Sequence, residues 1–275
     1  MALARHLAGH GRRFREGGDS VTPWEMLAVF AAGAGAGAVN TVVGSGSLIT
    51  FPVLLATGMP AVTAAVSNAL GVIPGSISGA IGYRAELSGQ SRRILKMSAG
   101  ALLGGLTGAT LLLVLPTTAF EKIVPALVAL ALVLVILQPL ISKSVRRRRE
   151  RTSGAARPDG GPLLLTGLTL ASVYGGYFPA AQGIIYLSLM GVLLDETLQR
   201  LNAVKNVLVA LVNTAAALFF LFSADFDWTT VLLVAVGSAL GGPIGAKAGR
   251  RLSPAVLRIL IVAVGTFAIV QLLRQ

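Results

Sequence analysis

The sequence contains no cysteine, which excludes disulfides, thiolate nucleophiles and cysteine-ligated metal sites. Histidine is almost absent as well, because the two residues of this type, His6 and His10, both lie in the polar N-terminal stretch. The apolar segments hold no paired carboxylates, no histidine-containing triad, no P-loop and no metal-ligand spacing. We therefore expect a protein that is not an enzyme and that uses no cofactor and no metal.

Charge is also scarce. Charged residues make up 12% of the chain, about half the share that is usual in a soluble domain. Hydrophobic residues make up 54%, and the stretches 97–120 and 123–142 carry no charge. A helix of about 20 apolar residues spans the hydrocarbon core of a bilayer. Since these runs do not alternate as barrel strands do, the sequence predicts an all-α, polytopic protein of the cell (inner) membrane.

The few acidic residues lie at segment ends or in loops, so no carboxylate is placed as a proton relay at the membrane midplane. Export of an anion needs no such relay. An inside-negative membrane potential drives an anion outward with ~2.3 kcal/mol per charge per 100 mV. The sequence is therefore compatible with potential-driven uniport of an anion.

The net charge of +12 comes mainly from tails and loops, above all from residues 143–157 with the run RRRR. A basic run can bind nucleic acid, but beside apolar helices it more often holds a loop on the cytoplasmic side. We expect no nucleic-acid partner. The chain then divides as follows: a polar N-terminal tail (1–22), a first membrane repeat (23–142), a basic cytoplasmic linker (143–161) and a second membrane repeat (162–275).

The membrane-like sequence occurs twice. GALLGGLTGA at 100–109 returns as GSALGGPIGA at 237–246, an offset of 137 residues (237 − 100). Upstream, AAVSN at 64–68 returns as NAVKN at 202–206, an offset of 138 residues (206 − 68). For the glycine-rich motif we favour a role in close helix packing over a role in ligand contact.

Each half opens with an apolar segment interrupted by glycine and proline, VVGSGSLITFP at 42–52 and VYGGYFPAAQG at 173–183. Duplicated units with a broken helix in each copy are typical of secondary transporters, whose binding sites lie at the breaks. The membrane segments that we expect are 24–57, 61–83, 97–115, 119–142, 162–194, 197–223, 228–247 and 253–273.

Loop charges indicate how the two repeats are oriented, because lysine and arginine mark cytoplasmic loops. The loop Arg84 to Lys96 is basic, whereas its counterpart with Asp225 and Asp227 is acidic. This opposite bias favours inverted repeats, in which the first segment of each repeat is a re-entrant hairpin of two short helices and both termini lie outside. Eight simple spans with both termini inside remain the alternative.

The breaks are the first candidates for binding. Gly44, Ser45, Gly46 and Ser47 can free backbone N–H groups, and such groups inside a membrane must face protein or a cavity. A helix starting at Ser47 would direct its positive end toward that cavity, as anion sites do. Pro52 would lie in its first turns. In the second half, the corresponding break is expected at Gly175 to Pro179, with Gln182 one turn further. The alternative is that these glycines only allow close packing.

Polar side chains within the apolar segments are the second group of candidates. Lys205 is flanked by Asn202 and Asn206, and a lysine at that depth costs roughly 2.5–3.5 kcal/mol. It either faces an anionic substrate or it snorkels or serves structure. Asn68 and Asn206 are matched by the repeat. The candidate substrate-binding residues are Asn40, Gly44, Ser45, Gly46, Ser47, Pro52, Asn68, Gly176, Tyr177, Phe178, Pro179, Gln182, Asn202, Lys205 and Asn206.

Residues 37–84 closely resemble the first repeat of the sulfite exporter TauE/SafE family, which are membrane transporters of the 4-toluene sulfonate uptake permease type. The resemblance rests on the glycine-rich break, the following Pro52, the turn at Gly58 and Pro60, and Asn68 in the next helix. It extends more weakly over about 24–273. It implies a transporter of sulfite, organosulfonates or related sulfur or carbon anions, whereas the residues themselves indicate only a small oxyanion.

Together these features predict a secondary transporter in the lipid bilayer that exports a small anion, bound near the midplane between the two broken segments. A homo-oligomer is left open. The alternatives are a channel-like protein without a transport cycle, and an importer of another small carboxylate or sulfur oxyanion.

Overall fold

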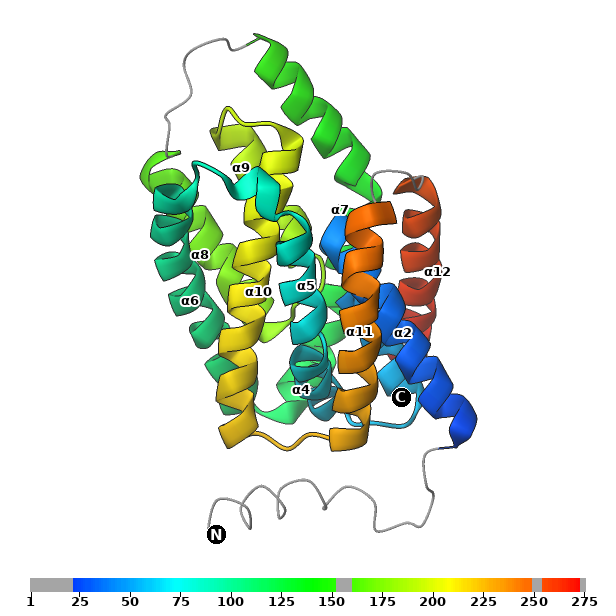
Figure 1. Ribbon diagram of the computed structural model, residues 1–275. Helices are drawn as coiled ribbons and strands as arrows, with labels where there is room; N and C mark the ends of the chain where they lie inside the picture. Colours follow the sequence, from blue (N-terminus) through cyan, green and yellow to red (C-terminus); the bar gives the residue numbers. More distant parts are fainter. Residues whose placement is uncertain (1–21, 152–159, 249–253, 273–275) are drawn as a thin grey trace.

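The computed structural model describes residues 22–151, 160–248 and 254–272, and these ranges contain helices and connecting turns but no strand (Figure 1). The all-α class is confirmed. The first half contains α2 (Pro23–Val42), α3 (Ser47–Ala56), α4 (Ala61–Gly71), α5 (Ile73–Gly82), the 3-10 helix η1 (Arg84–Leu87), α6 (Ser91–Val114) and α7 (Thr117–Arg151). The second half contains α8 (Gly161–Tyr177), α9 (Gln182–Leu193), α10 (Leu198–Ser223), α11 (Trp228–Ala248) and α12 (Pro254–Leu272).

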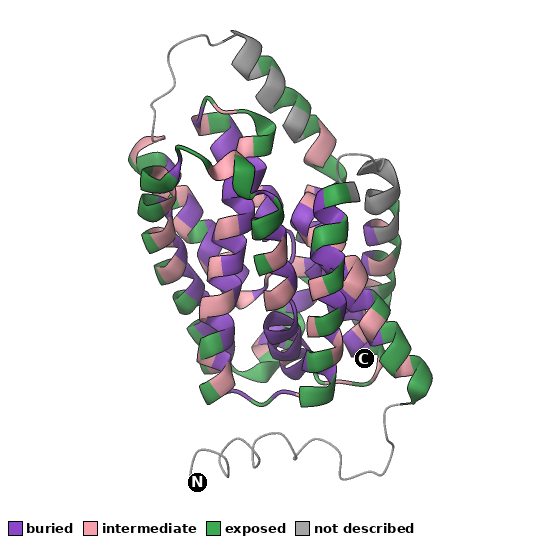
Figure 2. Ribbon diagram, viewed as in Figure 1, coloured by how far each residue is buried: buried purple, intermediate pink, exposed green. Residues whose placement is uncertain are grey.

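Six stretches in the described ranges are long and apolar enough to cross a bilayer: α2, α4 with α5, α6, the first 24 residues of α7, α10 and α11. By contrast, α3 has 10 residues and α9 has 12, which gives lengths of roughly 15–18 Å, too short for a span. Figure 2 shows buried residues along the interior of the bundle and exposed ones on its outside. The exposed positions include large apolar side chains, as expected for a surface that meets lipid, such as Leu103, Leu140 and Ile244.

Side-chain caps fix where several helices begin. At the start of α2, Thr22 Oγ1 accepts a hydrogen bond from the N–H of Glu25, and the Glu25 carboxylate accepts one from the N–H of Thr22. This reciprocal pair satisfies two N–H groups that the helix leaves free. Thr197 and Asp227 accept hydrogen bonds from the first turns of α10 and α11 in the same way.

Two helices extend beyond their predicted ends. The stretch Arg84 to Lys96, which we expected to be a loop, is helical from Ser91 onward, because lysine and arginine are good helix formers whose stems can lie along apolar neighbours. Helix α7 continues to Arg151, into the predicted linker 143–161. The remainder of that linker up to 159, and the predicted tail up to 21, lie outside the described residues.

The two halves pack by exchanging partners. Helix α2 packs along α11 of the other half, and its counterpart α8 packs along α6. In the same way, α3 contacts α12 and α9 contacts α7. Figure 1 shows that α3 ends at the lower end of the bundle, where α4 begins, whereas α9 ends at the upper end, where α10 begins.

The repeated glycine motif lies at these exchanged contacts. A Cβ atom on Gly108 of α6 would come within 2.0 Å of the Val173 carbonyl oxygen of α8. A Cβ on Gly241 of α11 would come within 2.0 Å of the Ala34 carbonyl oxygen of α2. Backbones approach this closely only where a residue as small as glycine lies at the contact. The packing interpretation of the motif is therefore confirmed.

We expect Gly241→Val to lower the melting temperature of the purified protein in detergent by several degrees, because forcing a side chain into a packed contact costs about 1–3 kcal/mol. Leu240→Val is the matched control, since Leu240 is the preceding residue of the same helix and is exposed. Equal melting temperatures for the two variants would contradict the packing role of Gly241.

Candidate functional site

The two breaks meet inside the bundle. The first lies between Val42, where α2 ends, and Ser47, where α3 begins. The second lies between Tyr177, where α8 ends, and Gln182, where α9 begins. The N–H of Gly183, in the first turn of α9, donates a hydrogen bond to the Gly44 carbonyl oxygen at 3.1 Å. Segments from opposite halves are thus joined through their backbones at the point where each helix is interrupted.

The first break has the predicted form. Helix α3 begins at Ser47 as expected, and Pro52 is buried within it. Gly44 has a φ of +85°, in the left-handed region that favours glycine, and this conformation ends α2. The N–H groups of Ser45, Gly46 and Ser47 have no acceptor among the described residues, as is usual at the start of a helix.

The second break lies a few residues later than expected. Gly175 and Gly176 belong to the last turn of α8, and the interruption covers residues 178–181. These glycines serve packing: a Cβ on Gly176 would come within 2.0 Å of the Gly105 carbonyl oxygen. The chain leaves the helix at Phe178, which is extended, immediately before Pro179, as expected for a residue that precedes proline.

The start of α9 resembles the start of α3 in its free donors. Within the described ranges, the N–H groups of Ala180, Ala181 and Gln182 have no acceptor. Ala181 has a φ of +60°, which is unusual for a residue other than glycine and costs about 1–2 kcal/mol. Strain of this kind persists where the surrounding structure enforces it, often at functional sites.

Several polar side chains at the breaks are buried without a hydrogen-bond partner in the described part of the protein. Ser45 Oγ, Gln182 Oε1 and Asn202 Oδ1 belong to residues that are at least nine-tenths buried, and the Tyr177 hydroxyl oxygen is also buried. All four residues were predicted as site residues. Buried polar atoms are normally paired, so unpaired ones near the two breaks make this place a candidate ligand site.

A chain of hydrogen bonds fixes the orientation of the Gln182 amide. The Ser172 hydroxyl donates to the Leu168 carbonyl oxygen at 2.6 Å, so its single proton is committed. The Tyr186 hydroxyl, 2.5 Å away, must therefore donate to Ser172 Oγ. Tyr186 in turn accepts from Gln182 Nε2 at 2.8 Å. This order leaves Gln182 Oε1 as the unpartnered atom.

Lys205 lies at the C-terminal end of α2. Its Nζ donates to the carbonyl oxygens of Asn40 at 3.3 Å and Thr41 at 3.2 Å. Asn206 and Asn202 also donate to the Thr41 oxygen, at 3.3 and 3.5 Å. Lys205 is fully buried, so the snorkelling alternative is wrong. Four hydrogen bonds from three side chains of α10 thus hold the interrupted end of α2.

Asn68, the repeat partner of Asn206, holds the other side of the first break. Its Nδ2 donates to Ser47 Oγ at 3.0 Å, and its Oδ1 accepts from the Thr50 hydroxyl. Asn68 therefore fixes the first turn of α3, whereas Asn206 fixes the last turn of α2. The side chain of Asn40 is directed elsewhere, because it donates to Ser76 of α5 at 3.2 Å.

Aromatic rings pack beside the second break. The Phe178 ring lies edge-on against Phe51 of α3, with ring centroids 5.3 Å apart. The Phe120 ring of α7 packs against the rings of Phe178 and Tyr177, with centroid distances of 6.3 and 5.6 Å. These edge-to-face contacts give the break an apolar wall on one side.

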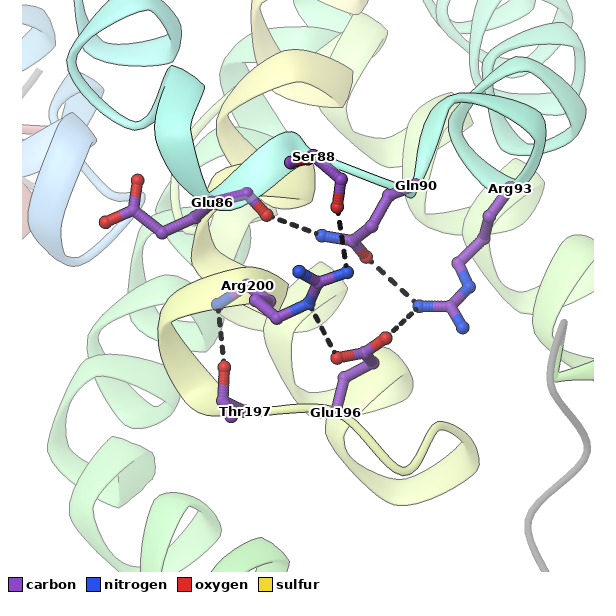
Figure 3. A network of polar contacts seen from close by, with 7 residues as sticks. All are labelled: Glu86, Ser88, Gln90, Arg93, Glu196, Thr197 and Arg200. Carbon is purple, nitrogen blue, oxygen red and sulfur yellow. Dashed lines mark hydrogen bonds and ion pairs between the residues drawn. The ribbon is translucent and has the colours of Figure 1, made fainter.

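A charged cluster joins the halves at the upper end of the bundle (Figure 3). The Glu196 carboxylate, just before α10, pairs with Arg93 of α6 at 3.0 Å and with Arg200 at 2.8 Å. Arg200 also donates to the Ser88 carbonyl oxygen, and Arg93 to the Gln90 side chain. All five residues lie outside the predicted site, and the cluster connects the α5–α6 turn with the α9–α10 turn.

Some contacts of the site were not predicted. Thr50, Ser172, Ser76 and Tyr186 are polar residues inside apolar segments, and that position alone was a usable signal. Tyr186 also lies four residues after Gln182, one helical turn away. The role of the Thr41 carbonyl could not be predicted, because every residue has a backbone carbonyl and none is marked in the sequence as a hydrogen-bond partner.

Comparison with known proteins gives consistent matches. Residues 29–272 match the family described as Sulfite exporter TauE/SafE. The chain is 27% identical to "Probable membrane transporter protein YfcA" of Escherichia coli (strain K12), over 92% of this chain and 91% of that protein. It is 26% identical to a "Probable membrane transporter protein" of Haemophilus influenzae, over 86% and 91%. No solved structure matches the chain.

The contact between the breaks leaves no room for a methyl group. A Cβ on Gly44 would come within 2.6 Å of Gly183 Cα, and the reverse distance is the same. We expect Gly44→Ala and Gly183→Ala to lower the melting temperature of the purified protein. Gly58→Ala is the control, because Gly58 has a similar φ of +80° but nothing within 4 Å of its Cβ. Gly58→Ala should lower the free energy of unfolding only by the cost of a left-handed φ for alanine, about 1 kcal/mol. Equal losses for Gly44→Ala and Gly58→Ala would argue against a tight contact.

Proposed function

The chain belongs to the sulfite exporter TauE/SafE family, and we propose that this multi-pass membrane transporter exports a small anion such as sulfite or an organosulfonate. The observation that carries the proposal is the meeting of two helix starts inside the bundle. Helices α3 and α9 both begin at the breaks, and the breaks are hydrogen-bonded to each other.

Free N–H groups and the positive end of the helix dipole favour an anion at a helix start. Here two such starts come together, and each leaves three backbone N–H groups without an acceptor in the described ranges. Ser45 Oγ, buried and unpartnered at the first break, adds a hydroxyl that can donate to an oxyanion. This combination supports a binding site for an oxygen-rich anion at the starts of α3 and α9, which flank the contact of Gly44 with Gly183.

The surrounding charge supports the same substrate class. The Lys205 stem passes α9 closely, since a Cβ on Gly183 would be 3.1 Å from Lys205 Cδ. No aspartate or glutamate is among the buried residues of the described ranges. A fixed positive charge without a buried carboxylate makes the field at the breaks attractive to anions and repulsive to cations.

We also propose that the two repeats are inverted, with α2–α3 and α8–α9 as hairpins that enter from opposite faces. The short length of α3 and α9, the exchanged packing of α2 with α11 and α8 with α6, and the opposite helix directions in Figure 1 support this arrangement. Helix α2 is longer than expected at 20 residues, and its first turn extends outward with Trp24 79% exposed.

In this arrangement one repeat can move against the other around a fixed site, which is the usual basis of alternating access. The upper end would open where the Glu196 cluster joins the two turns. The close contact of Gly44 with Gly183 favours a transport cycle over an open, channel-like pore, because the path between the breaks is filled by backbone.

Transport should follow the membrane potential. In liposomes at equal internal and external pH, we expect labelled sulfite to leave faster as the interior is made more negative. For a singly charged anion, 100 mV corresponds to ~2.3 kcal/mol, or about a 50-fold equilibrium ratio. Protein-free liposomes give the background. Flux that ignores the potential and follows a pH gradient would show that the uniport proposal is wrong.

Asn68→Ala should weaken anion transport. It removes both hydrogen bonds that hold the first turn of α3, each contributing about 1 kcal/mol, so we expect the KM for the anion to rise by up to about 30-fold. Asn213→Ala is the matched control, since Asn213 is also a buried amide but donates to Ser76. If both variants lower transport equally, Asn68 has no special role at the break.

A further inference from the structure

We infer that Lys205 is a tethered cation that occupies the position where other secondary transporters bind a coupling cation, so that anion transport here is independent of Na⁺. The inference rests on the proposed function, because it concerns how that same site is charged. It assigns Lys205 a positioning role at the end of α2 and goes beyond a general attraction for anions.

The first argument is geometric. A helix that ends inside a bundle exposes its last carbonyl oxygens, which form the negative end of the helix dipole. In broken-helix transporters such ends, together with unwound backbone, coordinate Na⁺. At the end of α2 the oxygens of Asn40 and Thr41 are instead held by Lys205 Nζ, at 3.3 and 3.2 Å. The ammonium supplies the same single positive charge to oxygens of the same kind.

The second argument is burial. Lys205 is fully buried, although a lysine within a membrane segment costs roughly 2.5–3.5 kcal/mol. In the described part of the protein its hydrogen-bond partners are the backbone carbonyls of Asn40 and Thr41, and no carboxylate is among them. A charge held in this way cannot exchange with cations from solution. The tethered amine therefore stays at the end of α2 in every step of a transport cycle.

The third argument comes from the repeat. At the offset of 138 residues, Lys205 corresponds to Ser67 (205 − 138) and Asn202 to Ala64 (202 − 138). Both residues that distinguish the second copy converge on the Thr41 carbonyl oxygen. Ser67 is neutral and its Oγ accepts from the Asp227 N–H instead. The two copies differ at the positions that contact α2, as expected if the cation has been built into one copy only.

The test compares the melting temperature of the purified, full-length protein in NaCl, propylammonium chloride and choline chloride at equal concentration. Lys205→Ala removes the ammonium and leaves space for a small cation. We expect Na⁺ or propylammonium to raise its melting temperature by at least about 3 °C over choline, as a ligand that binds only the folded state does. Wild type, Lys205→Met, whose side chain fills the space, and Arg200→Ala, a cation on the same helix, should show no such difference.

Lys205→Ala without any cation-specific stabilisation would overturn the inference. If that variant does not fold, two measurements still decide. Wild-type sulfite flux at a fixed potential should be equal in Na⁺ and choline media, and Lys205→Met should raise the KM for the anion at least tenfold. Na⁺-stimulated wild-type flux, or unchanged transport by Lys205→Met, would also overturn it. If wild type moves no anion at all, the proposed function fails, whereas the melting experiment still tests the cation position.

Discussion

The structure depends on one constraint: backbone that leaves a helix inside a membrane must find partners within the protein. Four helix ends meet this condition at the same place. The last carbonyl oxygens of α2 accept hydrogen bonds from Lys205 and its neighbours, and the Gly44 carbonyl oxygen accepts one from the N–H of Gly183. The first turn of α3 is held by Asn68. The starts of α3 and α9 each keep three N–H groups without an acceptor in the described ranges. At the end of α2 the carbonyls of Asn40 and Thr41 are held by side chains, whereas the amide starts of α3 and α9 stay free, and this asymmetry is what the proposed anion site rests on.

Glycine has two different uses here, and the sequence distinguishes them only in part. At Gly44 it permits a left-handed conformation that ends a helix, and the first break was predicted there. In the repeated motif, Gly108 and Gly241 allow backbones to touch, which the period of the motif also indicated. Gly175 and Gly176 were misassigned to a break. Gly176 allows close packing on Gly105 of α6, and Gly175 leaves room for the Gln182 side chain, so both are favourable inside a helix. Only the position of Pro179 indicated where α8 has to stop.

The elements of the fold were predictable because length and hydropathy decide them: the all-α class and the start of α3 at Ser47 followed from the sequence. The polar residues of the site could be nominated for a similar reason, since a buried Lys205 or Asn68 is costly unless it is used. Their partners could not be derived. Lys205 binds backbone oxygens 164 and 165 residues away, and a carbonyl carries no sequence signal. The extent of α6 and α7 also escaped prediction, because basic residues mark helix ends and loops equally well.

The two copies of the internal repeat differ in the charge that they supply to the site. Two similar copies would create two similar carbonyl ends, at α2 and at α8, but the second copy alone supplies a lysine and an additional asparagine toward α2. The copies can therefore pack in the same way, through Gly108 and Gly241, while only the second copy supplies the positive charge. Since the charge belongs to the chain, it does not cross the membrane with the substrate. In the proposed transport cycle the net charge moved is then that of the anion, and the membrane potential alone can supply the driving force.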